Sequence, residues 1–295
     1  MRQYLLHNSS DCTVHSYDVV VIGAGLAGLY CALNLPETIR VAILTKGTLS
    51  ESNSDLAQGG IAVTLPGMDP KGHFEDTLEA GSCVNDCESV AAMISDGSQH
   101  IEKLSNWGVT FDKDQDGNLS LTKEGGHSIR RVVHSKDTTG RAVMSLLRAR
   151  ALQSPNISIF ENTNAAELIV DPAEEEVVGL LSYRNGAIEL WAAGAVVLAT
   201  GGLGHLYQNT TNSGVVSGDG IAMAIRAGVT VADMEMVQFH PTAFAVKDGD
   251  RHFLISEALR GEGGILRDLN GQSLMEGVHP QGDLAPRDKI GRASC

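Results

Sequence analysis

The sequence predicts an α/β fold in which parallel strands alternate with helices. First, 42% of the 295 residues are apolar and 20% are charged, so the chain can bury a large core. Second, residues 18–22 form an apolar run typical of a strand, and a glycine-rich turn and a helix-forming segment follow it directly. Third, a strand-like run at residues 40–44 completes a βαβ unit of about 30 residues.

The turn after the first strand matches the pattern G-x-G-x-x-G through Gly23, Gly25 and Gly28. Gly23 permits the tight turn, Gly25 lets backbone N–H groups approach a pyrophosphate, and Gly28 lets the helix pack closely on the strand. The helix, expected at residues 29–35, presents its amino terminus to the phosphates. This arrangement predicts a Rossmann-like domain that binds a dinucleotide.

The end of the second strand departs from the pattern of NAD-binding units. Those units usually end this strand with Asp or Glu, which accepts a hydrogen bond from the ribose hydroxyl. Thr45 and Lys46 stand at this place. The dinucleotide is therefore not obviously NAD, and Lys46 suits a phosphate or ribose contact by another route.

Two later segments extend the same pattern. An apolar strand at residues 195–198 runs into the small residues 199–202, where a cofactor can approach the backbone. Residues 217–220 precede an apolar helix expected at residues 221–227. Asp219 is thus placed either as the cap of that helix or as an acceptor for a ribose hydroxyl.

Residues 112–118 contain the pattern D-x-D-x-D-G, which resembles the start of a calcium loop. Such a loop needs a bidentate Glu at its twelfth position, where this chain has Lys123. Strand-like segments at residues 109–112 and 119–122 lie on either side. We therefore interpret the segment as a hairpin turn.

Charge and cysteine content narrow the function classes. The 22 Lys and Arg residues against 36 Asp and Glu give a net charge of −14, so no nucleic-acid partner is expected. The apolar stretch at residues 190–200 is far shorter than the ~20 residues that span a bilayer, and residues 1–17 lack the apolar core of an export signal. The irregularly spaced cysteines suit reduced thiols in a cytoplasm, and Cys83 and Cys87 lack a second ligand pair, so no metal site is expected.

A series of motifs along residues 17–288 resembles the flavoprotein family of succinate dehydrogenases, fumarate reductases and L-aspartate oxidases. Besides the glycine turn, they are AQGGIA at residues 57–62, EGGHS at 124–128, ATGG at 199–202, SGDG at 217–220, QFHPT at 238–242, RGEG at 260–263 and LAPRD at 284–288. The resemblance implies a glutathione-reductase-like FAD-binding domain with the beginning of an α+β capping domain. The expected boundaries are an amino-terminal tail at residues 1–16, an incomplete FAD-binding domain at 17–235 and the start of the capping domain at 236–288.

Three places favour the L-aspartate oxidases within this family. Members with covalently bound flavin carry a His five residues before the Gln of A-Q-G-G, where this chain has Asn53, and an amide cannot form that link. His134, Asp137 and Arg141 fall as they do in L-aspartate oxidases, with Arg141 in place of the His of T-G-H. The amino-acid sequences of residues 256–260 and 285–287 also resemble those of L-aspartate oxidases.

The resemblance implies a non-covalent FAD site beside a substrate site, without a metal. The residues implied to hold FAD are Gly23, Ala24, Gly25, Leu26, Ala27, Gly28, Lys46, Asn53, Ser54, Ala57, Gln58, Gly59, Gly60 and Asp219. The residues implied to line the substrate site are Glu124, His240, Ser256, Glu257 and Arg287.

The implied reaction is the oxidation of L-aspartate to iminoaspartate, with electrons passed to O2 or fumarate, as the first step of de novo NAD biosynthesis. Arg287 can grip one substrate carboxylate through two parallel N–H donors, and His240 can hold the other or exchange a proton. Glu124 is the natural partner of the ammonium group. Quinolinate synthase is a candidate protein partner. The alternatives are a succinate dehydrogenase or fumarate reductase type of flavoprotein, and a non-catalytic nucleotide-binding fragment.

The chain departs from the family in its length. Most of the capping domain, a second substrate His, a further substrate Arg and the segment that returns to the FAD-binding domain have no counterpart in it. Residues 289–295 do not continue the family pattern and match the translation of AAG ATC GGA AGA GCG TCG TGT, the opening of a widely used sequencing adapter. We therefore expect a non-native tail at residues 289–295 and a partial sequence with little or no turnover.

Overall fold

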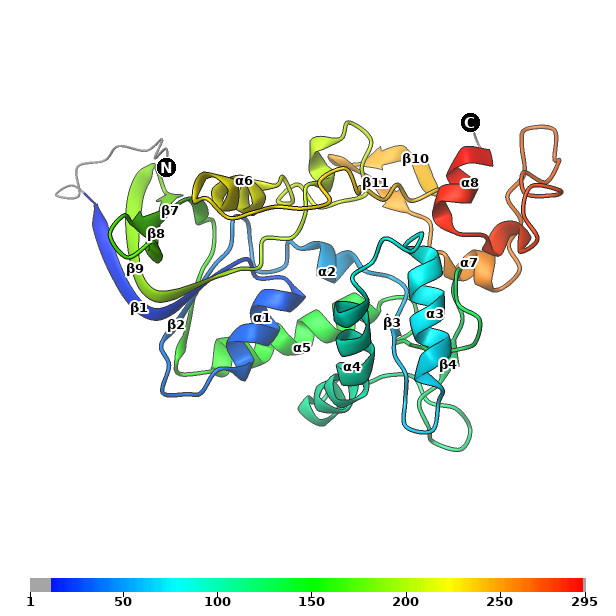
Figure 1. Cartoon of the computed structure of the whole chain (residues 1–295), viewed down its shortest axis with the longest axis horizontal. Coiled ribbons are helices and arrows are strands. Elements are labelled where there is room, and N and C mark those ends of the chain that lie inside the picture. The colour runs from blue at the N-terminus through cyan, green and yellow to red at the C-terminus, as the bar shows by residue number, and fades with distance from the viewer. Residues whose placement is uncertain (1–11, 294–295) are drawn as a thin grey trace. The chain divides into compact units, whose positions relative to one another are not determined.

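The computed structural model describes residues 12–293, and it divides into two compact units. The first comprises Met1–Leu56, Met144–Val237 and Lys247–His252. The second comprises Ala57–Val143, Gln238–Val246 and Phe253–Cys295. Figure 1 labels helices and strands of both units where there is room. Helix α5 (Thr139–Gln153) contributes residues to each of them.

The first unit is built on a six-stranded mixed sheet. Its strands are β1 (Thr13–Ile22), β2 (Val41–Leu44), β6 (Ile157–Phe160), β7 (Asn164–Asp171), β8 (Glu176–Arg184) and β9 (Ala187–Leu198). They lie in the order β6-β2-β1-β9-β8-β7. The neighbouring strands β6, β2, β1 and β9 are parallel, whereas β8 and β7 continue the sheet in antiparallel pairing. The predicted α/β fold is confirmed, and the antiparallel strands extend it.

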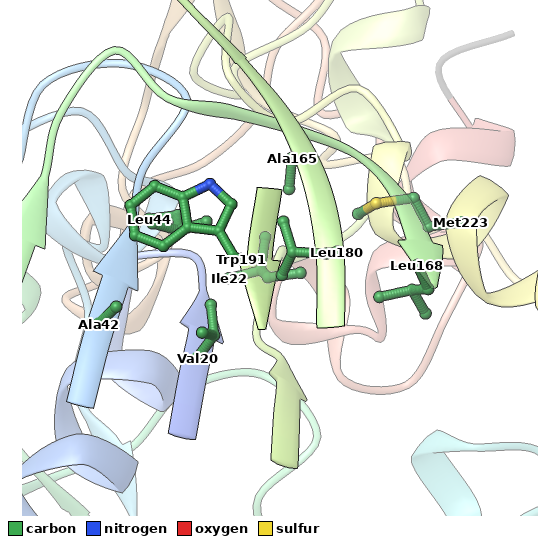
Figure 2. Packing of buried hydrophobic residues seen from close by; sticks show 9 residues of the cluster. All are labelled: Val20, Ile22, Ala42, Leu44, Ala165, Leu168, Leu180, Trp191 and Met223. Carbon is green, nitrogen blue, oxygen red and sulfur yellow. The ribbon is translucent and has the colours of Figure 1, made fainter. Parts of the chain in front are cut away.

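Helices cover both faces of this sheet. Met223 of helix α6 (Asp219–Arg226) packs with Val20 and Ile22 of β1 in a buried cluster that also contains Trp191 (Figure 2). Helix α1 (Leu26–Asn34) approaches the opposite face, because a Cβ on its Gly28 would contact Val21 and successive strand residues point to opposite faces. Burial on both faces explains why strand β2 is a continuous apolar run.

The second unit combines helices with short strands. It contains β3 (Ile61–Ala62), α3 (Pro70–Ala80), α4 (Cys87–Trp107), β4 (Leu121–Thr122), β5 (Val132–Val133) and α7 (Ala258–Gly261). The three strands form an antiparallel sheet in the order β3-β5-β4. Asp86 caps α4 by accepting a hydrogen bond from the Ser89 N–H at 2.7 Å. The C-cap after Trp107 is Gly108, whose φ of 114° favours glycine.

The later part of the chain forms small elements. Strands β10 (Ala243–Asp248) and β11 (Arg251–Leu254) make a two-stranded sheet. Helix α8 (Arg287–Ala293) buries Ile290 against Met275 and Ala285, so residues 289–293 are part of a helix. The last two residues of the expected non-native tail, 294 and 295, lie outside the described residues. The same holds for residues 1–11 of the expected amino-terminal tail.

Several predicted elements begin or end at other residues. Strand β1 begins at Thr13 rather than at residue 18, because residues 13–17 pair with β9 far along the chain. Helix α1 begins at Leu26 rather than at residue 29, so the glycine turn itself enters the helix. No strand forms at residues 109–112, where an isolated bridge between Lys113 and Leu119 closes the predicted turn instead.

Within residues 12–293, no helix combines the length and the apolar character needed to cross a membrane.

Candidate functional site

A pocket of about 360 Å³ lies in the first unit, at the carboxyl ends of β1, β2 and β9. The ends of parallel strands are where α/β sheets bind ligands. Nine residues predicted for the cofactor site line this pocket: Gly23, Ala24, Gly25, Leu26, Ala27, Lys46, Asn53, Ser54 and Asp219. The predicted Gly28 lies beside it, and the predicted Ala57, Gln58, Gly59 and Gly60 belong to the second unit.

The glycine turn brings three backbone segments together. Gly23 has a φ of 109°, and a Cβ there would lie 2.2 Å from the carbonyl oxygen of Ala199 in the segment after β9. A Cβ on Gly28 would lie 1.9 Å from the carbonyl oxygen of Gly23. The first and third glycines of the motif are thus required by close packing of the turn itself.

The amino terminus of helix α1 borders the pocket. Its N-cap is Gly25, which has no side chain to accept a hydrogen bond from the first turn. The Leu26 N–H donates to Ser54 Oγ at 3.0 Å. The backbone N–H groups of the first turn and the positive end of the helix dipole favour an anionic ligand here.

Lys46 and Asp219 meet in the pocket although they are far apart in the sequence. Lys46 Nζ lies 2.8 Å from Asp219 Oδ2 and donates to Ser217 Oγ at 2.6 Å. The N-cap of helix α6 is Gly218, so the interpretation of Asp219 as the cap is wrong. Asp219 instead occupies the first turn of the helix, where its charge is favourable, and orients Lys46.

Asn53 is held by the loop that follows β9. Its Oδ1 accepts a hydrogen bond from the Ser213 N–H at 2.8 Å, and its Nδ2 donates to Asn212 Oδ1. Both ends of the amide are therefore engaged within the protein.

Some pocket residues had no recognisable motif in the sequence. They are Thr163, Asn164 and Ala165 around the start of β7, and Val215 and Val216 in the loop before α6. Glu51 and Ser52 were also missed, although they lie next to the predicted Asn53.

In the second unit, Glu257 lies at the centre of the predicted substrate-site residues. Its side chain is 6% exposed. Arg287 Nε donates to its Oε2 at 2.7 Å, and Arg260 Nη2 lies 3.3 Å from its Oε1. Burial alone would raise the pKa of Glu257, but the positive charges of Arg287 and Arg260 outweigh it and lower the pKa. Glu257 is thus ionised and fixes the guanidinium of Arg287, which also donates to Gln238.

Glu124 has the opposite electrostatic environment. Burial and the neighbouring charge of Glu257 raise its pKa, against the opposing effect of Arg287. Its carboxylate accepts a hydrogen bond from the backbone N–H of Gly60. Glu124 can therefore take up a cationic group, or a proton, more readily than an exposed carboxylate.

His240 and Ser256 are oriented by neighbours. His240 Nδ1 lies 3.0 Å from the Thr242 carbonyl oxygen and 3.3 Å from the Thr242 backbone nitrogen, so Thr242 orients the imidazole ring. Burial and the charge of Arg287 lower the pKa of His240. Ser256 Oγ donates to Asp137 Oδ1 at 2.8 Å, so Asp137 joins the cluster as a residue that the predicted site did not include.

A buried ion pair anchors the segment that carries Glu124. Arg131 is 1% exposed and its Nη1 lies 2.5 Å from Oδ2 of Asp76 in helix α3. The same oxygen accepts hydrogen bonds from Ser128, through its N–H at 2.7 Å and its Oγ at 2.8 Å. Helix α3 therefore holds the far end of the E-G-G-H-S segment.

The structure places the other predicted motifs in structural roles. Asp114 Oδ1 accepts hydrogen bonds from the N–H groups of Asp116 and Asn118, which confirms the hairpin turn. Within the part of the chain that the structure describes, no three His, Cys, Asp or Glu side chains gather as they would around a metal ion. Cys83 and Cys87 are free and exposed.

Residues 18–295 match the family model described as FAD binding domain. The chain belongs to the FAD-binding domain family. As a member of that family it has FAD as its cofactor, as the sequence predicts. The α/β fold expected from the motifs is also that of the family.

The FAD-binding domain is similar to curated and solved proteins over nearly all of its length. It is 47% identical to an L-aspartate oxidase of Nostoc sp. over 94% of this chain and 48% of that protein. It is 41% identical to an L-aspartate oxidase of Clostridium acetobutylicum over 94% of this chain and 62% of that protein. The predicted similarity to L-aspartate oxidases is confirmed. The chain spans about half the length of the Nostoc relative and less than two thirds of the length of the Clostridium acetobutylicum relative.

Two solved structures share the fold of this FAD-binding domain. A variant of E. coli quinol fumarate reductase FrdA aligns with a TM-score of 0.88 at 31% identity, covering 96% of this chain and 50% of that chain. Sdh1 of Mycobacterium smegmatis aligns with a TM-score of 0.80 at 33% identity, covering 95% and 49%.

The pocket residues fit the cofactor. A Cβ on Gly23 would meet Ala199 and a Cβ on Gly25 would meet Ser54, so both positions suit glycine. The amino terminus of α1 can receive a pyrophosphate. Lys46 and Asp219 offer a cation and an acceptor side by side. These groups suit the phosphates and the ribose hydroxyls of FAD.

Replacing Gly23 with Ala should weaken FAD binding by at least ~10-fold and lower the free energy of unfolding by about 1–3 kcal/mol. The new Cβ would collide with the Ala199 carbonyl, and the φ of 109° is unfavourable for Ala. FAD titration followed by flavin fluorescence measures the affinity. Gly72→Ala in helix α3 is the matched control, since its Cβ would come no closer than 3.8 Å to another atom. Equal affinities of the two variants would contradict the prediction.

Proposed function

We propose that this protein oxidises L-aspartate to iminoaspartate. The observation that carries the proposal is the arrangement of Glu124, Glu257 and Arg287 in the second unit, where an ionised Glu257 fixes a guanidinium and Glu124 remains available to a cation. A substrate with carboxylates and an ammonium group complements such a set of charges. The L-aspartate oxidases among the relatives support the same substrate.

The chain's own residues bind and orient the substrate in this proposal. Arg287 holds one carboxylate with N–H donors that Glu257 and Gln238 keep in place. Glu124 receives the ammonium group, and Ser256 and His240 complete the polar lining. When bound, FAD supplies the acceptor for the two electrons that leave the substrate. We propose that the residues of the first-unit pocket hold FAD without a covalent bond, because Asn53 cannot form one.

The remaining parts of the proposal follow the relatives. We propose that residues 17–235 form the FAD-binding domain and that residues 236–288 begin a capping domain. O2 or fumarate would accept the electrons, and the product would enter NAD biosynthesis in the cytoplasm, with quinolinate synthase as a candidate partner. A succinate dehydrogenase or fumarate reductase activity is the second candidate, favoured by the alignment with the E. coli FrdA variant.

Steady-state assays distinguish these activities. The FAD-loaded protein, and the longer product wherever the source DNA continues in frame past residue 288, would be assayed with L-aspartate and with succinate. Hydrogen peroxide formation and dye reduction report the two outcomes. A higher kcat/KM for L-aspartate supports the proposal, whereas turnover of succinate alone supports the second candidate.

The pH dependence of kcat/KM for L-aspartate should be bell-shaped. The pKa of Glu124 is raised, so its carboxylate, and with it ammonium binding, is lost as the pH falls through that pKa. The pKa of His240 is lowered, so its cationic form, which can hold a carboxylate, is lost as the pH rises through that pKa. A Glu124→Gln variant should lose the acidic limb and a His240→Gln variant the alkaline limb. A profile that keeps both limbs in both variants would assign them to other groups.

A further inference from the structure

The carboxylate of Glu124 rests on backbone that carries no side chain. A Cβ built on Gly59 would lie 2.3 Å from Glu124 Oε1, which is closer than real Cβ contacts come. The next residue, Gly60, donates its backbone N–H to the same carboxylate. Gly59 does not have a positive φ, so the packing around Glu124, and not backbone conformation, is what a side chain at residue 59 would disturb.

A second carboxylate in the cluster is held in the same way. A Cβ on Gly125 would lie 2.4 Å from Glu257 Oε1, and the Gly125 N–H donates to that oxygen at 3.1 Å. Each carboxylate therefore packs directly against a glycine. The two carboxylates differ in their ion pairs: Glu257 is paired with Arg287 and Arg260, whereas no Lys or Arg within residues 12–293 forms an ion pair with Glu124.

Glu124 differs from Glu257 in having no ion-pair partner of its own among residues 12–293. Glu124 and Glu257 both interact with the guanidinium group of Arg287, Glu257 also interacts with Arg260, and the charge of Asp137 acts on Glu124. Both guanidinium groups lie against Glu257. An ammonium group placed at Glu124 would satisfy the carboxylate that the protein itself leaves without a cation.

We propose that Gly59 is a specificity-determining position, whose missing side chain seats the Glu124 carboxylate where it selects an amino dicarboxylate over a dicarboxylate without an amine. The inference rests on the proposed function, which it deepens. Gly59 acts through Glu124 and is therefore a positioning residue. It adds a role to the one that the A-Q-G-G motif implies, which is contact with FAD.

A double-mutant cycle tests this role. Gly59→Ala should lower the ratio of kcat/KM for L-aspartate to that for succinate by about 10-fold, the loss expected for one hydrogen bond to a charged group. The loss should arise mainly in KM for L-aspartate. In the Glu124→Ala background, where no carboxylate remains to be displaced, Gly59→Ala should change the ratio less than about 2-fold. Gly72→Ala in helix α3 is the matched control, since its Cβ would come no closer than 3.8 Å to another atom.

An NMR titration tests the geometry independently of turnover. In the unsubstituted protein the Gly60 amide resonance should titrate with Glu124, and both Gly59→Ala and Glu124→Gln should abolish that titration. An equal loss of discrimination in both backgrounds, or a Gly60 amide that does not titrate, would overturn the inference. Absence of L-aspartate oxidation in the unsubstituted protein would count against the proposed function, and the amide titration alone would then decide about Gly59.

Discussion

Asp76→Ala should lower the free energy of unfolding of the second unit by about 3–5 kcal/mol. The substitution leaves the guanidinium of Arg131, which is 1% exposed, without its carboxylate partner in the protein interior. It also removes the acceptor of two hydrogen bonds from Ser128. Denaturant unfolding followed by circular dichroism measures the loss.

Two further variants isolate the buried charge as the cause. Glu75→Ala on the same helix should cost little, because Glu75 and its partner Lys71 are both exposed. Adding Arg131→Met to Asp76→Ala should restore much of the stability, since no unpaired charge then remains. A double variant as unstable as the single one would show that packing rather than charge explains the effect.

The Asp76 pair also has a pH dependence. Although burial opposes it, hydrogen bonds from Ser128 and the contact with Arg131 lower the pKa of Asp76. A lowered pKa in the folded state contributes stability above the pKa of the unfolded state, and that contribution is lost as the pH falls through the folded-state value. The unsubstituted protein should therefore lose more stability on acidification than Asp76→Ala does.

Arg287→Leu should reduce kcat/KM for L-aspartate by at least ~100-fold, equivalent to about 2.7 kcal/mol. The guanidinium is the group best placed to grip a carboxylate, and Glu257 and Gln238 hold it by hydrogen bonds of 2.7 Å each. The fold should survive, because Glu257 retains Arg260 as a partner. Steady-state kinetics and an unfolding curve of the same preparation measure both effects.

Arg267→Leu serves as the control for this variant. Arg267 is exposed in the same unit and donates to a loop carbonyl, so its loss should leave kcat/KM unchanged. If Arg287→Leu retained the kinetics of the unsubstituted protein, Arg287 would have no place in the substrate site.

Local patterns in the sequence predicted the first βαβ unit well. The apolar run, the glycine turn and the second strand are close in sequence, and each follows from the conformation that its own residues prefer. The length of β1 could not be predicted in this way, because its first residues, from Thr13, become a strand by pairing with β9. Asp219 was predicted as a pocket residue, but its ion pair with Lys46 depends on the order of strands in the sheet.

The second-unit cluster was predicted from the resemblance to a family and not from periodicity. Nothing in the local sequence joins Glu124 to Gly59 or Ser256 to Asp137, since these contacts form only when distant segments fold together. The burial of Arg131 could not be predicted from the sequence either, because arginine is normally an exposed residue.

The state of the flavin tests most directly whether the first unit holds FAD without a covalent bond. Protein loaded with FAD and freed of excess ligand would be precipitated with acid and separated into pellet and supernatant. We expect one equivalent of FAD in the supernatant and a colourless pellet. A yellow pellet would show a covalent link despite Asn53, and protein that took up no flavin at all would contradict the assignment of the pocket.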